Sequence, residues 1–166
     1  MSTADSHELV HADGHRPPAR RAVGARGARG AQPQTMTVLV FSDDVSTRER
    51  IRLAVGRRPV ADLPAIEYVE CATHRAVIDT VDRGGVDVVV LDGEAVPFGG
   101  MGVCRQIKDE IYNCPPVLVL TGRRDDAWLA AWSRADAAVP HPINGVSLAP
   151  AVADLMRRRL AHEPVR

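Results

Sequence analysis

One stretch of the sequence decides the fold class: VDVVVLD, at residues 86–92. Apart from Asp87, its residues up to Leu91 are apolar, and such a run is typical of a strand that helices cover on both faces. The stretch ends in Asp92. Ligands of open parallel sheets bind beyond the carboxyl ends of the strands, so the sequence predicts that Asp92 lies at the functional edge.

Strand and helix patterns alternate on both sides of this stretch. We expect strands at residues 37–41, 66–72, 86–91, 117–121 and 137–139, and helices at about 46–56, 73–83, 103–111, 125–135 and 147–160. A capping box, Ser46-Thr47-Arg48-Glu49, is expected to open the first helix. Five β/α units in a row favour one α/β domain, in which an open parallel sheet carries helices on both faces.

The composition limits the functions that the chain can have. Its 166 residues suffice for one globular domain, and a formal net charge of zero argues against a dedicated nucleic-acid binder. The cysteines, Cys71, Cys104 and Cys114, form neither a CxxC pair nor a zinc spacing, which favours buried thiols in a reducing cytosol. No apolar stretch has the roughly 20 residues that span a bilayer, and the N-terminus lacks a signal region. We therefore expect a cytoplasmic protein.

The first 35 residues differ from the rest of the chain. They are rich in arginine, glycine and alanine and lack apolar periodicity, so we predict a flexible, disordered arm over residues 1–35. The domain is expected over residues 36–161, followed by a short tail over 162–166. His7, His11 and His15 recur at the i, i+4 spacing of a metal-binding helix face. A disordered tail that contains histidines explains them more simply.

Polar side chains follow four of the five expected strands. Asp43 and Asp44 come after the first strand, Asp92 after the third, Thr121 ends the fourth and His141 follows the fifth. Carboxylates that are placed together repel one another unless a cation is present, and Mg²⁺ with its oxygen ligands suits such a cluster. One carboxylate could then attack a phosphorus centre while the ion and a hydroxyl hold the phosphoryl oxygens. The alternative is that these acids only cap helices.

Four segments of the sequence resemble the receiver domains of bacterial response regulators. Residues 37–44 are similar to the first strand of the family with its acidic pair, and residues 86–92 to its third strand with the phosphoacceptor. Residues 100–108 are similar to the following loop and helix, and residues 117–122 to the fourth strand with its hydroxyl. The order and spacing of the four segments also agree with the family. The resemblance covers residues 36 to about 160. It implies a flavodoxin-like, doubly wound sheet of five parallel strands in the order 2-1-3-4-5.

The resemblance also implies the chemistry of the site. Asp92 would be the phosphoacceptor and carry an acyl phosphate. Mg²⁺ would be held by Asp92 and the backbone carbonyl of Glu94, with Asp43 or Asp44 as a further ligand. Thr121 would donate to a phosphoryl oxygen and so couple phosphorylation to the movement of nearby loops.

The sequence departs from the receiver pattern at two positions of the last strand. His141-Pro142 stands where the family has Lys-Pro, and an imidazole is shorter than a lysine side chain and only partly cationic at neutral pH. His141 either binds the phosphoryl group in place of lysine or merely fills its space. Ala138 stands where the family has a Tyr or Phe that changes position on phosphorylation. The usual coupling between threonine and aromatic residue is therefore not expected.

The first expectation for function is a stand-alone receiver of a two-component phosphorelay, and not an enzyme. Its partners would be a sensor histidine kinase or phosphotransfer protein and an unknown downstream protein, with neither DNA nor a membrane bound. A second copy of the chain is a further candidate partner. Trp128 and Trp132 share a face of the helix expected at 125–135, where they form either a partner surface or part of the core.

Two other functions remain open from the sequence. A receiver-like adaptor that works without phosphorylation is favoured by His141 and Ala138. A small acidic-pocket phosphatase is the third candidate. Its pattern requires a second Asp two residues after the nucleophile, where this chain has Glu94, and a separate substrate cap, which we do not expect here.

Overall fold

The computed structural model describes residues 35–123 and 126–161, in which strands and helices alternate along the chain. The elements are β1 (Thr35–Phe41), α1 (Val45–Val55), β2 (Ala65–Cys71), α2 (His74–Asp82), β3 (Val88–Asp92), α3 (Gly100–Glu110), β4 (Val117–Thr121), α4 (Ala127–Trp132), β5 (Ala137–Pro140) and α5 (Gly145–Leu160). The predicted arm lies outside the described residues, with its three histidines, except for Thr35, which begins β1. The predicted tail lies outside them as well.

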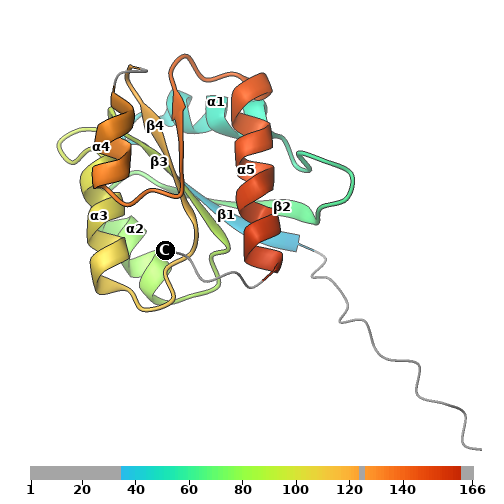
Figure 1. The fold of residues 1–166 in the computed structure, drawn as a ribbon, viewed down its shortest axis with the longest axis horizontal. Coiled ribbons are helices and arrows are strands. Elements are labelled where there is room, and N and C mark those ends of the chain that lie inside the picture. Colours follow the sequence, from blue (N-terminus) through green and yellow to red (C-terminus); the bar gives the residue numbers. More distant parts are fainter. Residues whose placement is uncertain (1–34, 124–125, 162–166) are drawn as a thin grey trace, which may run out of the picture. The chain divides into compact units, whose positions relative to one another are not determined.

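The five strands form one parallel sheet in the order β2-β1-β3-β4-β5, which confirms the predicted topology. Helices α1 and α5 cover one face of the sheet, and α2, α3 and α4 cover the other (Figure 1). Every residue of β3 and β4 is buried, as expected for central strands with helices on both sides. The apolar run that ends at Asp92 is therefore the middle of the sheet.

Side chains alternate strictly between the two apolar layers. Residues 38, 40, 88, 90, 118 and 120 pack with α1 and α5, whereas residues 39, 41, 89, 91, 117 and 119 pack with α2 and α3. This alternation follows from the two-residue period of a strand. The alternation also determines on which side of the sheet the side chains just beyond a strand end lie. If the register of a strand shifted by one residue, its side chains would move to the opposite layer.

Several element boundaries differ from the sequence expectations, and local interactions accompany three of them. Helix α1 begins at Val45, because Asp44 caps it, and the capping box predicted at residues 46–49 is wrong. Strand β3 begins at Val88, directly after Asp87, whose backbone N–H donates to the carbonyl of Thr37 at 2.9 Å and whose carboxylate accepts from the N–H of Thr37 at 2.8 Å. Helix α4 ends at Trp132, because the backbone turns to a positive φ of 65° at Arg134. In the described part of the chain, no helix combines the length and apolarity that crossing a membrane requires.

Candidate functional site

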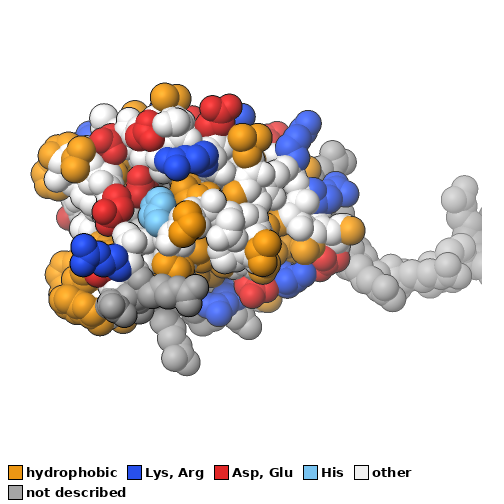
Figure 2. Space-filling view, turned by 90° about the horizontal axis from the view of Figure 1, so that it is seen from above, with side chains coloured by type: hydrophobic (Ala, Val, Ile, Leu, Met, Phe, Trp, Pro, Cys, Tyr) orange, Lys and Arg blue, Asp and Glu red, His pale blue; other side chains and the backbone are white. Residues whose placement is uncertain are grey.

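The carboxyl edge of the sheet brings together the ends of β1, β3, β4 and β5. In the strand register, Phe41 pairs with Leu91, Asp92 with Leu120, and Thr121 with Pro140. The residues at or just beyond these ends are therefore neighbours, as the sequence predicted. Figure 2 looks onto this edge, where acidic and basic side chains are interspersed around a histidine and neither sign of charge dominates.

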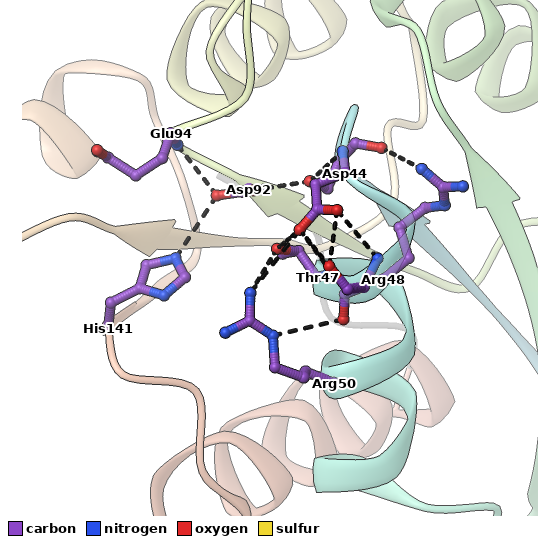
Figure 3. A network of polar contacts seen from close by, with 9 residues as sticks. Asp44, Thr47, Arg48, Arg50, Asp92, Glu94 and His141 are labelled. Carbon is purple, nitrogen blue, oxygen red and sulfur yellow. Dashed lines mark hydrogen bonds and ion pairs between the residues drawn. The ribbon is translucent and has the colours of Figure 1, made fainter.

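Asp92 is the centre of this edge, and its side chain is almost completely buried (Figure 3). The hydroxyl of Ser42 donates to Oδ2 of Asp92 at 2.8 Å, and the backbone N–H of Glu94 donates to Oδ1 at 3.0 Å. Nε2 of His141 lies 3.5 Å from the same Oδ1. Each carboxylate oxygen therefore has its own set of neighbours. The two hydrogen bonds fix the orientation of this buried carboxylate, whose oxygens are the candidate nucleophiles of the site.

His141 reaches the carboxylate from the end of β5. Its backbone N–H donates to the carbonyl of Thr121 at 2.8 Å, which continues the pairing of β4 and β5 by one residue. Its Nε2 atom is buried and, among the described residues, has no hydrogen-bond partner. Thr121 is itself buried at the end of β4. His141 therefore lies beside Asp92 on the side of Oδ1, and Thr121 follows Leu120, the residue of β4 that pairs with Asp92.

Asp44, predicted as a metal ligand, has a different role in the structure. Its Oδ1 accepts from the N–H and hydroxyl of Ser46 at 3.1 and 2.7 Å, and its Oδ2 accepts from the N–H and hydroxyl of Thr47 at 3.1 and 2.7 Å. These bonds, that from the Thr47 hydroxyl above all, lower the pKa of Asp44 to about 2. The carboxylate caps α1 and turns toward the helix (Figure 3), which leaves Asp43 as the candidate ligand of the acidic pair.

Ser42 is the site residue that the sequence analysis missed. It directly follows β1, is fully buried, and donates a hydrogen bond to Asp92. In the sequence, the acidic pair that follows it is the more conspicuous signal. The strand alternation could have found it. Because Phe41 pairs with Leu91, the next residues of the two strands, Ser42 and Asp92, must come side by side. Asp43 is exposed and remains the acid of this turn whose carboxylate does not cap the helix.

The loop after Asp92 folds back tightly on the end of β3. A Cβ atom on Gly100 would lie 2.6 Å from the carbonyl oxygen of Asp92 and 2.9 Å from Cβ of Leu91, so this position requires glycine. A Cβ atom on Gly122 would overlap the carboxylate of Glu94. The side chain of Glu94 therefore lies over the residue that follows Thr121, at the border of the pocket.

The donors of the pocket fit a magnesium ion with few protein ligands. Within residues 35–123 and 126–161, no group of three or more His, Cys, Asp and Glu side chains is arranged to hold a metal ion. Mg²⁺, however, is commonly bound by one or two carboxylates together with water and phosphate oxygens. Asp43, Asp92 and the backbone carbonyl of Glu94 are the groups of the pocket that could hold such an ion.

Trp128 and Trp132 lie on α4 and are exposed, with relative accessibilities of 67% and 56%. The alternative that they are core residues is therefore wrong. The guanidinium of Arg105 on α3 stacks over the ring of Trp132 at 5.7 Å and donates to its carbonyl at 3.1 Å. The cysteines Cys71, Cys104 and Cys114 are free and buried, as predicted.

Comparison with known proteins identifies the family. Over 122 residues the chain is 57% identical to the response regulatory proteins MT3230 and Rv3143 from two strains of Mycobacterium tuberculosis, CDC 1551 / Oshkosh and H37Rv. The match covers 74% of this chain and 92% of each relative. The chain belongs to the response-regulator family. No protein-family model matches the chain.

Solved receiver domains share the fold of this response regulator. The Francisella response regulator 1452 receiver domain is 18% identical with a TM-score of 0.63, over 74% of this chain and 98% of that one. The receiver domain of a Vibrio parahaemolyticus LuxO repressor protein is 22% identical with a TM-score of 0.64, over 78% and 95%. TrrA of Thermotoga maritima, solved with Mg²⁺ and BeF, is 22% identical with a TM-score of 0.59, over 72% and 98%. The response regulator therefore has the fold of a receiver domain.

Proposed function

We propose that this receiver domain accepts a phosphoryl group on Oδ1 of Asp92. The observation that carries the proposal is the proximity of this oxygen to Nε2 of His141, which is buried, lies 3.5 Å away and has no hydrogen-bond partner among the described residues. A phosphoryl group on Oδ1 would give the imidazole an anionic oxygen to bind. The hydroxyl of Thr121, from the neighbouring strand end, would serve a second phosphoryl oxygen.

The proposed reaction is a phosphoryl transfer between two proteins. Oδ1 of Asp92 forms a bond to the phosphorus of a phosphohistidine on a sensor kinase or phosphotransfer protein, and the bond from phosphorus to the histidine nitrogen breaks. Asp92 becomes an acyl phosphate and the donor histidine is released. When bound, Mg²⁺ would neutralise phosphoryl oxygens, held by Asp43, Asp92 and the carbonyl of Glu94. The complex of TrrA with Mg²⁺ and BeF supports this choice of ion.

The same proposal covers the mode of action and the location. The chain would act by binding rather than by turnover, since its acyl phosphate is a signal that a downstream protein recognises. The exposed Trp128 and Trp132 are the candidate contact residues for that protein, because tryptophan is enriched at interface hot spots. We place this activity in the cytoplasm, because its reducing environment keeps thiols such as the three free cysteines reduced.

Phosphorylation is tested with the full chain, acetyl phosphate labelled at phosphorus and Mg²⁺. We expect label on the wild type, none on Asp92→Asn, and unchanged labelling of Asp79→Asn. The control residue is an exposed acid of α2 that pairs with Arg75. Folding of each variant is checked by circular dichroism. Labelling that persists in Asp92→Asn, or is absent from folded wild type with both acetyl phosphate and a set of sensor kinases, would contradict the proposal.

A receiver-like adaptor that needs no phosphate is the second candidate. Two observations favour it: both oxygens of Asp92 already accept hydrogen bonds from the protein, and the exposed Ala138 supplies no aromatic ring that could move on phosphorylation. Once a partner has been captured, its dissociation constant is compared between the wild type and Asp92→Asn with and without BeF₃⁻. Equal constants in all samples would favour the adaptor, and tighter binding of the activated wild type alone would favour the phosphorylated receiver.

A further inference from the structure

The hydroxyl of Ser42 is a bridge between two turns of the pocket. Its oxygen accepts a hydrogen bond from the backbone N–H of Asp44 at 3.1 Å and lies 2.8 Å from Oδ2 of Asp92. A hydroxyl has a single proton, and the carboxylate can only accept. The proton of Ser42 therefore points at Oδ2, and the orientation of this donor is set by the turn that precedes α1.

The backbone of Ser42 is held as firmly as its side chain. Its N–H donates to the carbonyl of Cys71 at 3.3 Å, and its carbonyl accepts from the guanidinium of Arg48 at 2.6 Å. Nε of Arg48 pairs with the carboxylate of Glu70, on β2, at 3.1 Å, which fixes the position of the guanidinium. Because each polar group of Ser42 has a partner, the hydroxyl is positioned for Asp92 before any ligand arrives.

The two oxygens of Asp92 face different sides of the pocket. Oδ1 faces Glu94 and His141, whereas Oδ2 faces the end of β1 through Ser42. Asp43 directly follows Ser42, so it also comes from the β1 side. A cation shared by Asp43 and Asp92 would therefore lie on the Oδ2 side of the pocket, next to the hydroxyl of Ser42.

We infer that the hydroxyl of Ser42 competes with the divalent cation for Oδ2 of Asp92 and so weakens metal binding. This inference rests on the proposed function of the pocket. Cation binding at Oδ2 has to replace a hydrogen bond to a charged acceptor, and such bonds correspond to about tenfold or more in an equilibrium constant. Without the hydroxyl, the buried oxygen has lost a partner, and the cation restores it. Removal of the competitor therefore tightens binding.

The test measures metal binding directly and does not depend on phosphorylation. Mg²⁺ is titrated by calorimetry and Mn²⁺ by electron paramagnetic resonance, using the full-length wild type, Ser42→Ala and Ser46→Ala. We expect about tenfold tighter binding by Ser42→Ala and no change for Ser46→Ala. Ser46 is a matched control, because its hydroxyl bonds to Asp44, at 2.7 and 2.8 Å, in the same turn. Ser42→Cys, which keeps a weak donor, should bind Mg²⁺ with intermediate affinity and serves if the alanine variant does not fold.

A purely structural role of Ser42 would give a different result. Loss of packing alone would leave metal affinity unchanged or lower it, and a hydroxyl that is itself a ligand would lower it in Ser42→Ala. Either outcome overturns the inference, as does a failure of every protein to bind the ion. If Asp92→Asn abolishes binding while wild type and Ser42→Ala bind equally well, the metal site of the proposed function stands and only the role of Ser42 is refuted.

Discussion

Replacement of Lys108 by methionine is expected to destabilise the fold strongly. Nζ of Lys108 lies 2.6 Å from Oδ2 of Asp136 and 3.4 Å from the carbonyl of Pro115. The two side chains of the pair are only 3% and 11% exposed. Methionine retains most of the volume but leaves the carboxylate with the N–H of Val117, at 2.7 Å, as its remaining hydrogen-bond donor. Breaking one side of such a buried pair costs about 3–5 kcal/mol.

Urea unfolding followed by circular dichroism measures this cost. With a slope of about 1–3 kcal/mol/M, the midpoint should fall by at least about 1 M. The control is Arg75→Met, which removes an exposed pair with Asp79 at 3.0 Å and should cost less than about 1 kcal/mol. The double variant Lys108→Met/Asp136→Asn should recover most of the loss, since an amide oxygen still accepts from Val117. A loss below about 1 kcal/mol for Lys108→Met, or no recovery in the double variant, would refute the reasoning.

Three further predictions concern the edges of the site. Asp44→Ala removes the cap of α1, and because the pKa of Asp44 is lowered from 3.8 to about 2, its stabilisation is present above pH 4 and lost as pH falls toward 2. The variant should therefore be less stable at pH 7, and its stability should depend less on pH in that window. Trp128→Ala should change the free energy of unfolding by no more than about 0.5 kcal/mol, because the ring is exposed. Gly100→Ala should cost about 1–3 kcal/mol and reduce labelling of Asp92, since the new methyl group overlaps its carbonyl.

Each of these predictions has a contradicting result, and the one at Gly100 has a matched control variant. Acid unfolding of Asp44→Ala that parallels the wild type would argue against the cap. If Trp128 were buried, its truncation to alanine would lower the free energy of unfolding by about 3–5 kcal/mol, so the measurement distinguishes an exposed ring from a buried one. Gly102→Ala is the matched control for Gly100→Ala. Gly102 lies on the same helix, and a Cβ atom there would have no neighbour within 4 Å. Equal labelling and stability of the two alanine variants would contradict the close approach of the loop.

The fold could be predicted because its signals are repeated along the whole chain. Each apolar run is a strand, and the strand at Val88–Asp92 is buried on both faces, which places it in the centre of a parallel sheet. The position of Asp92 beside Thr121 and His141 follows from the same topology, since the carboxyl ends of parallel strands share one edge. These conclusions depend on the pattern of many residues, so no single local exception could alter them.

The details of the acidic turn could not be predicted in the same way. Ser42, Asp43 and Asp44 follow β1 without a break, and the sequence does not show which of them turns toward the sheet and which toward the helix. That choice depends on the hydrogen bonds of Asp44 with Ser46 and Thr47. For the tryptophans, the spacing predicted a common face, but only packing against the sheet and α3 shows that this face points outward.

The exposed face of α4 also gives this protein a built-in optical reporter. Trp128 and Trp132 are the two tryptophans of the sequence, and both lie on this short helix. Native emission therefore originates from one small region and should peak at the long wavelengths of hydrated indole. A protein that docks on α4 would shift the emission to the blue, whereas one that docks elsewhere would leave the spectrum unchanged. An unlabelled fluorescence titration can thus distinguish the two docking positions.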